Sequence, residues 1–93
     1  MALTTLIIRH RVKEYAAWRE EYNSVESLRE KYGCIGAEVL TDPADDTDVF
    51  VLHRFLSLER AQGFAGSDDL HEAMAHAHVV GAPRIEFALE RLS

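Results

Sequence analysis

Two short apolar segments constrain most strongly what this 93-residue chain can fold into. The first contains Leu6, Ile7 and Ile8, and the second, residues 49–52, reads Val-Phe-Val-Leu. Segments of this kind, bounded by charged residues, are typical of β-strands that are apolar on both faces. Each of these strands therefore needs apolar cover on both sides of its sheet.

A long amphipathic helix is predicted over residues 14–32. Its apolar and aromatic residues recur at steps of three and four, the period of a helix that packs one face on a core. They are Tyr15, Trp18, Tyr22, Val25, Leu28 and Tyr32. The charged residues between them are interpreted as a solvated face: Arg19, Glu20, Glu21, Glu26, Arg29, Glu30 and Lys31. Gly33 is expected to end the helix, because glycine often follows a helix C-terminus in the left-handed conformation.

Three further strands are predicted. Residues 34–41 and 48–56 show the composition of strands, and the polar turn at 42–46 joins them into an antiparallel hairpin. Residues 84–92 alternate apolar and charged side chains, which indicates a last strand with one wetter face.

Two short helices lie between the third and the last strand. Ser57 is expected to cap a helix that runs through Phe64, and Ser67 to cap a second helix that ends at Gly81-Ala82-Pro83. The resulting order, β-α-β-β-α(α)-β, is the ferredoxin-like pattern. The sequence thus predicts an α+β fold with a four-stranded antiparallel sheet, in a single domain over residues 1–93.

The predicted sheet has helices on one side only, so its other face would be exposed in a monomer. An apolar face of that extent exceeds what soluble monomers normally leave in contact with water. The simplest cover is the same face of a second copy, and we therefore expect a homodimer. Arg9 and Arg11 are expected at this interface, or in pairs with Glu86 or Glu90 at a sheet edge.

Composition limits the partners and cofactors. A formal net charge of −6 argues against binding to nucleic acid or to an anionic membrane surface. The chain has one cysteine, Cys34, and no HExxH-like motif, so neither an internal disulfide nor a metal site is expected. The absence of a phosphate loop and of a dinucleotide-binding motif argues against a bound flavin or nicotinamide, and we expect no cofactor. No membrane-spanning run or signal-peptide pattern is found, which predicts a cytoplasmic protein.

Several motifs carry a resemblance to a known family. They are Val12-Lys13 before the aromatic helix, the segment VLHRFLSLE at 51–59, Phe64-Ala65-Gly66-Ser67, Leu70, Ala73-Met74 and Gly81-Ala82-Pro83-Arg84-Ile85. In these motifs the chain resembles the antibiotic-biosynthesis-monooxygenase-like group of the dimeric α+β-barrel superfamily, over nearly its whole length. The resemblance implies a dimeric α+β barrel with a pocket in each protomer, between the sheet and its helices.

The same resemblance suggests the activity. The haem-degrading branch of this group carries Asn, Trp and His at positions that align with Ile8, Phe64 and Met74, so haem chemistry is not expected. Other members are cofactor-free monooxygenases of polyketide-type aromatics and quinol oxygenases. The resemblance therefore favours a cofactor-independent monooxygenase acting on a small aromatic, phenolic or quinol-type molecule. The alternatives are a non-redox binding or cyclase-like homodimeric module, and a dimer whose pocket is filled.

Two histidines are candidate catalytic bases. His10 has the strand parity of Leu6 and Ile8, and His53 lies two residues from Val51 on the third strand. A neutral imidazole suits proton transfer near pH 7, and burial would lower its pKa. Each could equally be a core histidine with satisfied hydrogen bonds. Because the first and third strands are neighbours in a ferredoxin-like sheet, both histidines could face one cavity.

Aromatic and apolar side chains are candidates for the walls of that cavity. Trp18 and Tyr22 lie on the stripe of the first helix that packs on the sheet, where they serve either as core or as partners of a flat ligand. Glu72 and His76 share a helical face, as a surface ion pair or as a pair at the pocket mouth. The predicted substrate pocket comprises Trp18, Tyr22, Phe64, Met74 and His76.

Overall fold

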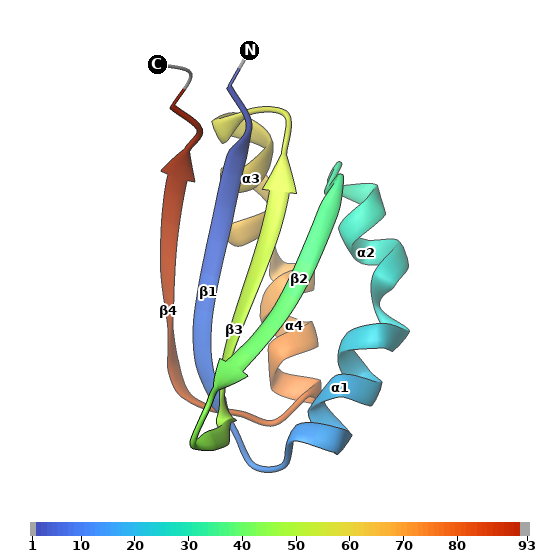
Figure 1. The fold of residues 1–93 in the computed structure, drawn as a ribbon. Helices are drawn as coiled ribbons and strands as arrows, with labels where there is room; N and C mark the ends of the chain where they lie inside the picture. The colour runs from blue at the N-terminus through green and yellow to red at the C-terminus, as the bar shows by residue number, and fades with distance from the viewer. Residues whose placement is uncertain (1, 92–93) are drawn as a thin grey trace.

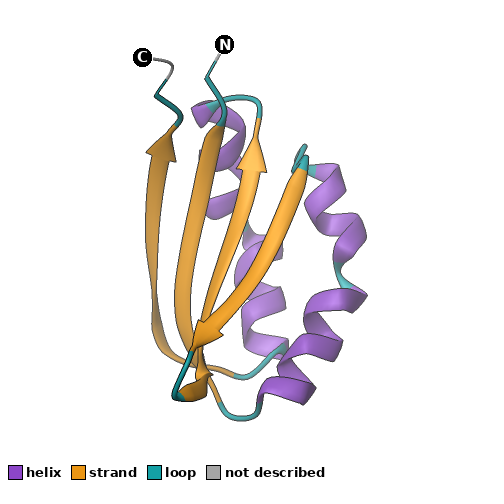
Figure 2. Cartoon of the chain, viewed as in Figure 1, coloured by secondary structure: helices purple, strands orange, loops and turns teal. Residues whose placement is uncertain are grey.

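The computed structural model describes residues 2–91 and has four helices packed on one face of a four-stranded antiparallel sheet (Figures 1 and 2). The strands are β1 (Thr4–Val12), β2 (Gly36–Asp42), β3 (Asp45–Phe55) and β4 (Val79–Leu89), and the helices are α1 (Tyr15–Ser24), α2 (Glu26–Lys31), α3 (Leu58–Ala65) and α4 (Asp68–His76). The strand order is β2-β3-β1-β4. The predicted ferredoxin-like α+β fold is confirmed. No helix among the described residues is long and apolar enough to cross a membrane.

The two central strands present different side chains to the two faces of the sheet. On β1, every second residue from Thr4 to Val12 is buried beneath the helices, including Leu6, Ile8 and His10. On β3, Val49, Val51, His53 and Phe55 are buried on the same face. The opposite face, called the open face below, carries no helix (Figure 2). On β1, β2 and β3, the apolar residues of the open face are Ile7, Leu40, Phe50 and Leu52.

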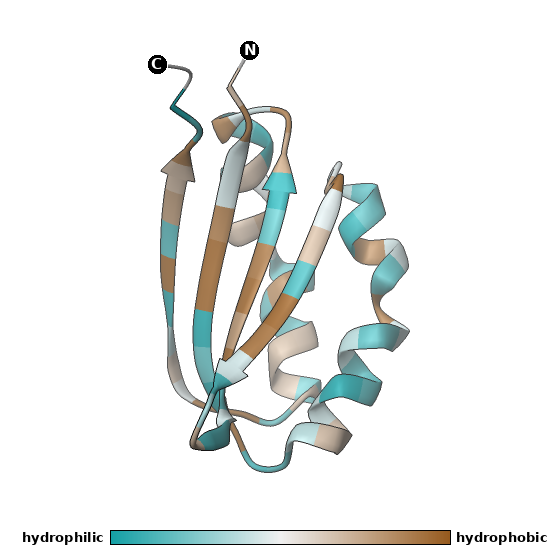
Figure 3. Cartoon of the chain, viewed as in Figure 1, coloured by the Kyte–Doolittle hydropathy of each residue, from teal (hydrophilic) through white to brown (hydrophobic). Residues whose placement is uncertain are grey.

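The core between sheet and helices consists of two apolar clusters. One contains Leu6, Ile8 and Phe55 of the sheet with Phe64 of α3. The other contains Val12, Val49 and Val51 with Trp18 of α1. Figure 3 shows the apolar residues concentrated along the middle of β1 and β3.

The single helix predicted over residues 14–32 is instead two helices, α1 and α2. The break lies at Val25, where φ is −106° and ψ is 24°. Two side chains bind carbonyl oxygens near this break: Ser24 Oγ donates to Glu21 O at 2.7 Å, and Arg29 Nη1 donates to Tyr22 O at 2.9 Å. Carbonyls in the last turn of a helix lack partners within the helix, so these bonds stabilise the end of α1.

The predicted end after α2 and the two predicted serine caps are confirmed, whereas α4 ends at His76, before the predicted end at Gly81-Ala82-Pro83. Gly33 follows α2 with a φ of 84°, the left-handed conformation expected after the helix. Ser57 and Ser67 cap α3 and α4, because each hydroxyl accepts a hydrogen bond from the backbone N–H three residues further on.

β4 begins at Val79, five residues earlier than the predicted start at Arg84. Arg9 pairs with Arg84 and Arg11 with Val80, so the three residues 81–83 lie opposite His10 in a bulge. β4 is an edge strand, and a bulge on an edge strand tolerates a proline and a glycine with positive φ. The Gly-Ala-Pro sequence therefore marks a bulge within β4 and not the end of α4, which lies at His76.

Arg9 and Arg11 both form ion pairs within the chain. Arg9 Nη2 lies 2.7 Å from Asp48 Oδ2, and Arg11 Nη1 lies 2.9 Å from Asp45 Oδ2. The predicted pairing with the glutamates of the last strand is wrong, because β1 lies beside β3 and the acidic residues at the start of β3 are within reach. Both pairs lie at one end of the open face.

Candidate active site

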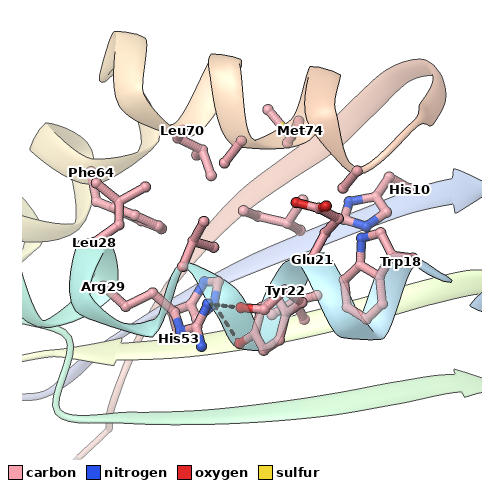
Figure 4. A pocket seen from close by; sticks show the side chains of 15 residues that line it. His10, Trp18, Glu21, Tyr22, Leu28, Arg29, His53, Phe64, Leu70 and Met74 are labelled. Atoms are coloured by element: carbon pink, nitrogen blue, oxygen red, sulfur yellow. Dashed lines mark hydrogen bonds between the residues drawn. The ribbon is translucent and has the colours of Figure 1, made fainter. Parts of the chain in front are cut away.

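A cavity of about 50 Å³ lies between the sheet and the helices (Figure 4). Its walls come from β1 and β3 and from all four helices. Six of the seven predicted site residues line it: His10, Trp18, Tyr22, His53, Phe64 and Met74. The seventh, His76, lines an outer groove instead.

Strand pairing places the two histidines at opposite ends of the cavity floor. His10 pairs with Val49 and His53 pairs with Leu6, so the two positions are four residues apart along the paired strands. At about 3.3 Å per residue, their Cα atoms are separated by about 13 Å along the strands. Ile8 and Val51, which pair with each other, form the floor between them.

An aromatic row connects the two ends (Figure 4). The ring centroids of Trp18 and Tyr22, one helical turn apart on α1, are separated by 5.0 Å. Trp18 lies 5.5 Å from His10, and Tyr22 lies 6.0 Å from His53 with nearly parallel rings. Phe64 contacts His53 edge to face at 5.4 Å. The row lines one side of the cavity with aromatic rings, against which an aromatic ligand can pack.

His53 is 3% exposed and engages a tyrosine. Its Nε2 lies 3.0 Å from the hydroxyl of Tyr22, while its Nδ1 is buried with no partner. Burial, and to a smaller extent the positive charge of Arg29 and the presence of His10, lower the pKa of His53 to about 4. The imidazole is therefore neutral at pH 7.

His10 is 7% exposed, and neither of its ring nitrogens has a hydrogen-bond partner. Burial lowers the pKa of His10 to about 4, so this ring is also neutral at pH 7. Buried polar atoms without a partner are rare in folded proteins, because each costs free energy. These nitrogens are thus available to a ligand that enters the cavity.

Arg29 is a site residue that the sequence pattern misplaces. The pattern puts it on the solvated face of the helix, but it is 9% exposed and lines the cavity. Its guanidinium carbon lies 3.9 Å from the centroid of the Tyr22 ring. Arg29 follows Tyr22 by seven residues, a spacing that returns to the same side of a helix, so the sequence could have indicated that Arg29 lies beside Tyr22.

An outer groove of about 280 Å³ opens between α1, α2 and α4. It shares Glu21, Val25, Leu28 and Ala73 with the cavity, so these side chains separate the cavity from the groove. Glu72 and His76, the predicted pair at the pocket mouth, both line this groove. Together with Asp69 and Glu21 they make its rim largely acidic.

The size of the cavity limits what it holds in this conformation. An apolar protein cavity that binds benzene measures roughly 150 Å³, about three times this volume. An aromatic ligand therefore needs side chains between cavity and groove to move. Met74 lines the cavity and has a flexible, unbranched side chain that suits such an adjustment.

The family model for antibiotic biosynthesis monooxygenase matches residues 6–76. No curated protein sequence matches the chain. Among the residues that the structure describes, no group of three or more His, Cys, Asp or Glu side chains is arranged to hold a metal ion.

Solved structures with this fold cover nearly the whole chain. A Bordetella bronchiseptica protein, assigned as an antibiotic biosynthesis monooxygenase, superposes with a TM-score of 0.84 at 13% identity over 99% of this chain and 100% of its own. A Nitrosomonas europaea protein of unknown function gives 0.76 at 18% identity, over 100% and 93%. SnoaB, a cofactor-independent oxygenase from Streptomyces nogalater, gives 0.72 at 9% identity, over 100% and 95%. At these identities the likeness concerns the fold.

Proposed function

The chain belongs to the antibiotic biosynthesis monooxygenase family, and on that premise we propose that it is a monooxygenase that needs no metal or organic cofactor. Its substrate is a small aromatic molecule of the phenol or quinol type. One observation carries the proposal: a cavity walled by aromatic rings holds two neutral, buried histidines with unpartnered ring nitrogens. The description of SnoaB as a cofactor-independent oxygenase supports the same class of reaction.

His10 is the general base in this proposal. Both of its ring nitrogens are without a partner, whereas Nε2 of His53 is engaged by Tyr22. His10 takes the proton of the substrate hydroxyl, and the resulting anion transfers one electron to O₂. The substrate radical and superoxide then combine at a conjugated ring carbon that carries hydrogen. The peroxide regains a proton from His10 and loses water, which leaves a quinone. Phenol and O₂ thus give quinone and one water, and the enclosed cavity keeps solvent from the intermediates.

We expect O₂-dependent oxidation of a phenol or quinol, with one oxygen atom from ¹⁸O₂ in the product. Replacing His10 with Gln should lower kcat/KM by about 100-fold, the usual contribution of a general base. The kcat/KM of the unmodified protein should fall on the acid side, towards the pKa of about 4 of His10, and this fall should be absent from the variant. Oxygen uptake and mass spectrometry of the product measure these effects.

The matched control is His71→Gln, a change at an exposed position of α4 that should leave the rate unchanged. Turnover that continues without O₂, or that is unaffected by His10→Gln, would contradict the proposal. Ligand-induced thermal stabilisation without oxygen uptake would instead favour the binding or cyclase-like alternative.

Haem does not fit the site. Ile8, Phe64 and Met74, at the positions that correspond to the functional residues of the haem-degrading branch, all line the cavity, and none offers an imidazole. The cavity volume of about 50 Å³ is also far below that of a porphyrin. We therefore predict that added haem gives no histidine-ligated Soret band and that reductant causes no ring cleavage. A stoichiometric haem complex that releases iron would contradict this prediction.

The active protein is a homodimer in this proposal. The open face exposes Leu40 at 49% and carries Ile7, Phe50 and Leu52 on the adjoining strands. The same face of a second copy would cover these side chains and bury the apolar surface. Ion pairs such as Arg9–Asp48 at one end of the face would then lie at the rim of the interface.

A further inference from the structure

We infer that Arg29 and His53 form an anion-stabilising end of the cavity, which holds negative charge on an oxygen of the deprotonated substrate. The inference rests on the proposed function for the identity of the substrate. The existence of the anion site rests on the geometry around Tyr22 alone.

Arg29 is a buried cation without a counter-ion. Among residues 2–91 its guanidinium forms no ion pair with a carboxylate. Its contacts are the carbonyl of Tyr22, to which Nη1 donates at 2.9 Å, and the face of the Tyr22 ring. A buried charge is costly unless it is paired, and cation–π contact compensates only part of that cost. A ligand with negative charge at this end of the cavity would supply the missing partner.

His53 adds a hydrogen-bond donor at the same end. Burial raises the pKa of the Tyr22 phenol and the charge of Arg29 opposes the rise, so the phenol keeps its proton at neutral pH. A cation over the ring also makes a phenol a better donor. The Tyr22 hydroxyl therefore donates to Nε2 of His53, 3.0 Å away. The imidazole proton is then on Nδ1, which is buried and unpartnered, so His53 offers an N–H group to a ligand.

This arrangement reduces a difficulty in the proposed proton transfer. His10 has a pKa of about 4, whereas an ordinary phenol has a pKa of about 10. Without assistance, the equilibrium for proton transfer from the phenol to His10 is unfavourable by about a million-fold. A cation within about 4–6 Å and a hydrogen bond to the charged form each lower the pKa of the group they contact. Arg29 and the Nδ1–H group of His53 supply both effects at the far end of a conjugated substrate, so they favour the delocalised anion that His10 generates.

The acidic groove and the cationic end of the cavity act on different forms of the substrate. Glu21 and Glu72 on the groove disfavour anions, and the chain as a whole has a net charge of −6. The substrate therefore enters as a neutral molecule and ionises inside. Because His10 and His53 lie at opposite ends of the cavity floor, the negative charge must move across the substrate. This specifies a conjugated substrate with oxygen functions at opposite ends of its ring system.

The experiment uses 4-nitrophenol, which ionises near neutral pH and whose two forms absorb at different wavelengths. Titration of the full chain at a series of pH values, under argon, gives the affinity for each form. We expect the phenolate to bind about tenfold more tightly than the phenol, which lowers the apparent pKa of the bound dye by about one unit. Because the chain is acidic overall, a preference for the anion must come from a local cation.

Three variants locate that cation. Arg29→Met should abolish the preference, and Arg29→Lys, which keeps the charge, should retain most of it. Arg60→Met is the matched control, since it makes the same change in net charge at an exposed position on α3 and should retain the full preference. Preferential binding of the neutral phenol, no binding of either form, or an unchanged preference in Arg29→Met would each overturn the proposal.

A second measurement needs no ligand and is independent of whether Arg29→Met folds. The ¹⁵N chemical shifts of the imidazole rings distinguish the Nδ1–H form from the Nε2–H form. We expect His53 to be the Nδ1–H form, and to change to the Nε2–H form in Tyr22→Phe, which removes the donor. A His53 ring protonated on Nε2 in the unmodified protein would overturn the proposed donor role.

These readouts separate the inference from the proposed function. A preference for phenolate and the Nδ1–H form in a protein that consumes no O₂ would support the anion site and contradict the oxygenase. Oxygen consumption by a protein that binds 4-nitrophenol preferentially in its neutral form would support the oxygenase and contradict the anion site.

Discussion

Between pH 6.5 and pH 4, the free energy of unfolding is expected to fall by several kcal/mol at a fixed protein concentration. His10 and His53 bind a proton near pH 6.5 in the unfolded chain but, because they are buried, only near pH 4 in the folded protein. Within this window the unfolded state binds more protons, so stability decreases as the pH falls. The difference between 6.5 and about 4 corresponds to about 3 kcal/mol for each histidine. Two such contributions are comparable with the total stability of a small domain, about 5–15 kcal/mol.

Chemical denaturation at pH 7, 6, 5 and 4 measures this effect. His10→Gln and His53→Gln should each remove about half of the pH dependence, and His71→Gln, at an exposed position on α4, should leave it intact. Carboxylates do not obscure the window. Hydrogen bonds from Thr47 and Arg11 lower the pKa of Asp45 to about 2, so its contribution is lost only below about pH 4. A free energy of unfolding that is constant from pH 7 to pH 4 would show that the folded protein protonates both histidines freely.

Six of the side chains that meet in the cavity could be predicted from the sequence. Strand parity places His10 with Ile8, and helical spacing places Trp18 and Tyr22 on one stripe. These relations depend on local geometry, which alternates every residue in a strand and every three or four residues in a helix. Adjacent central strands of the ferredoxin-like sheet then bring His53 to the same cavity.

Features that depend on packing between elements could not be predicted in this way. The break at Val25 is one such feature, because nothing in the apolar period of residues 14–32 marks it. A charged residue is assigned to solvent by default, because burial of an arginine is rare without a partner. The tyrosine ring and carbonyl that receive Arg29 come from the preceding helix, so the pattern of α2 alone does not reveal them.

The partners of charged residues on the open face depend on strand register in the same way. Arg11 pairs in register with Asp48, and Arg9 reaches the same carboxylate from the neighbouring position on its own face. The sequence predicted the neighbouring strands but not which residues lie opposite one another. The pairs with Asp45 and Asp48 therefore required the structure.

Leu52→Asp is expected to convert the protein from a dimer into a monomer. Leu52 lies on the open face of β3, where Ile7 of β1 is its pairing partner. In the proposed dimer this position is covered by the partner sheet, in an interface that buries more than about 1,000 Å² in total. A carboxylate there would be desolvated without a partner, so we expect the dimer dissociation constant to rise by about 100-fold or more.

Sedimentation velocity at micromolar concentration distinguishes the two states. The unmodified protein should sediment as a dimer and Leu52→Asp as a monomer, with helical content retained, because the helix-covered core does not include Leu52. The matched control, Ala16→Asp, adds the same charge at an exposed position in the first turn of α1 and should remain dimeric. A stable monomer of the unmodified protein at this concentration would contradict the proposed dimer. In that case the apolar side chains of the open face, of which Leu40 is 49% exposed, would remain in contact with water, and the apolar cover that both central strands need would be missing on one side.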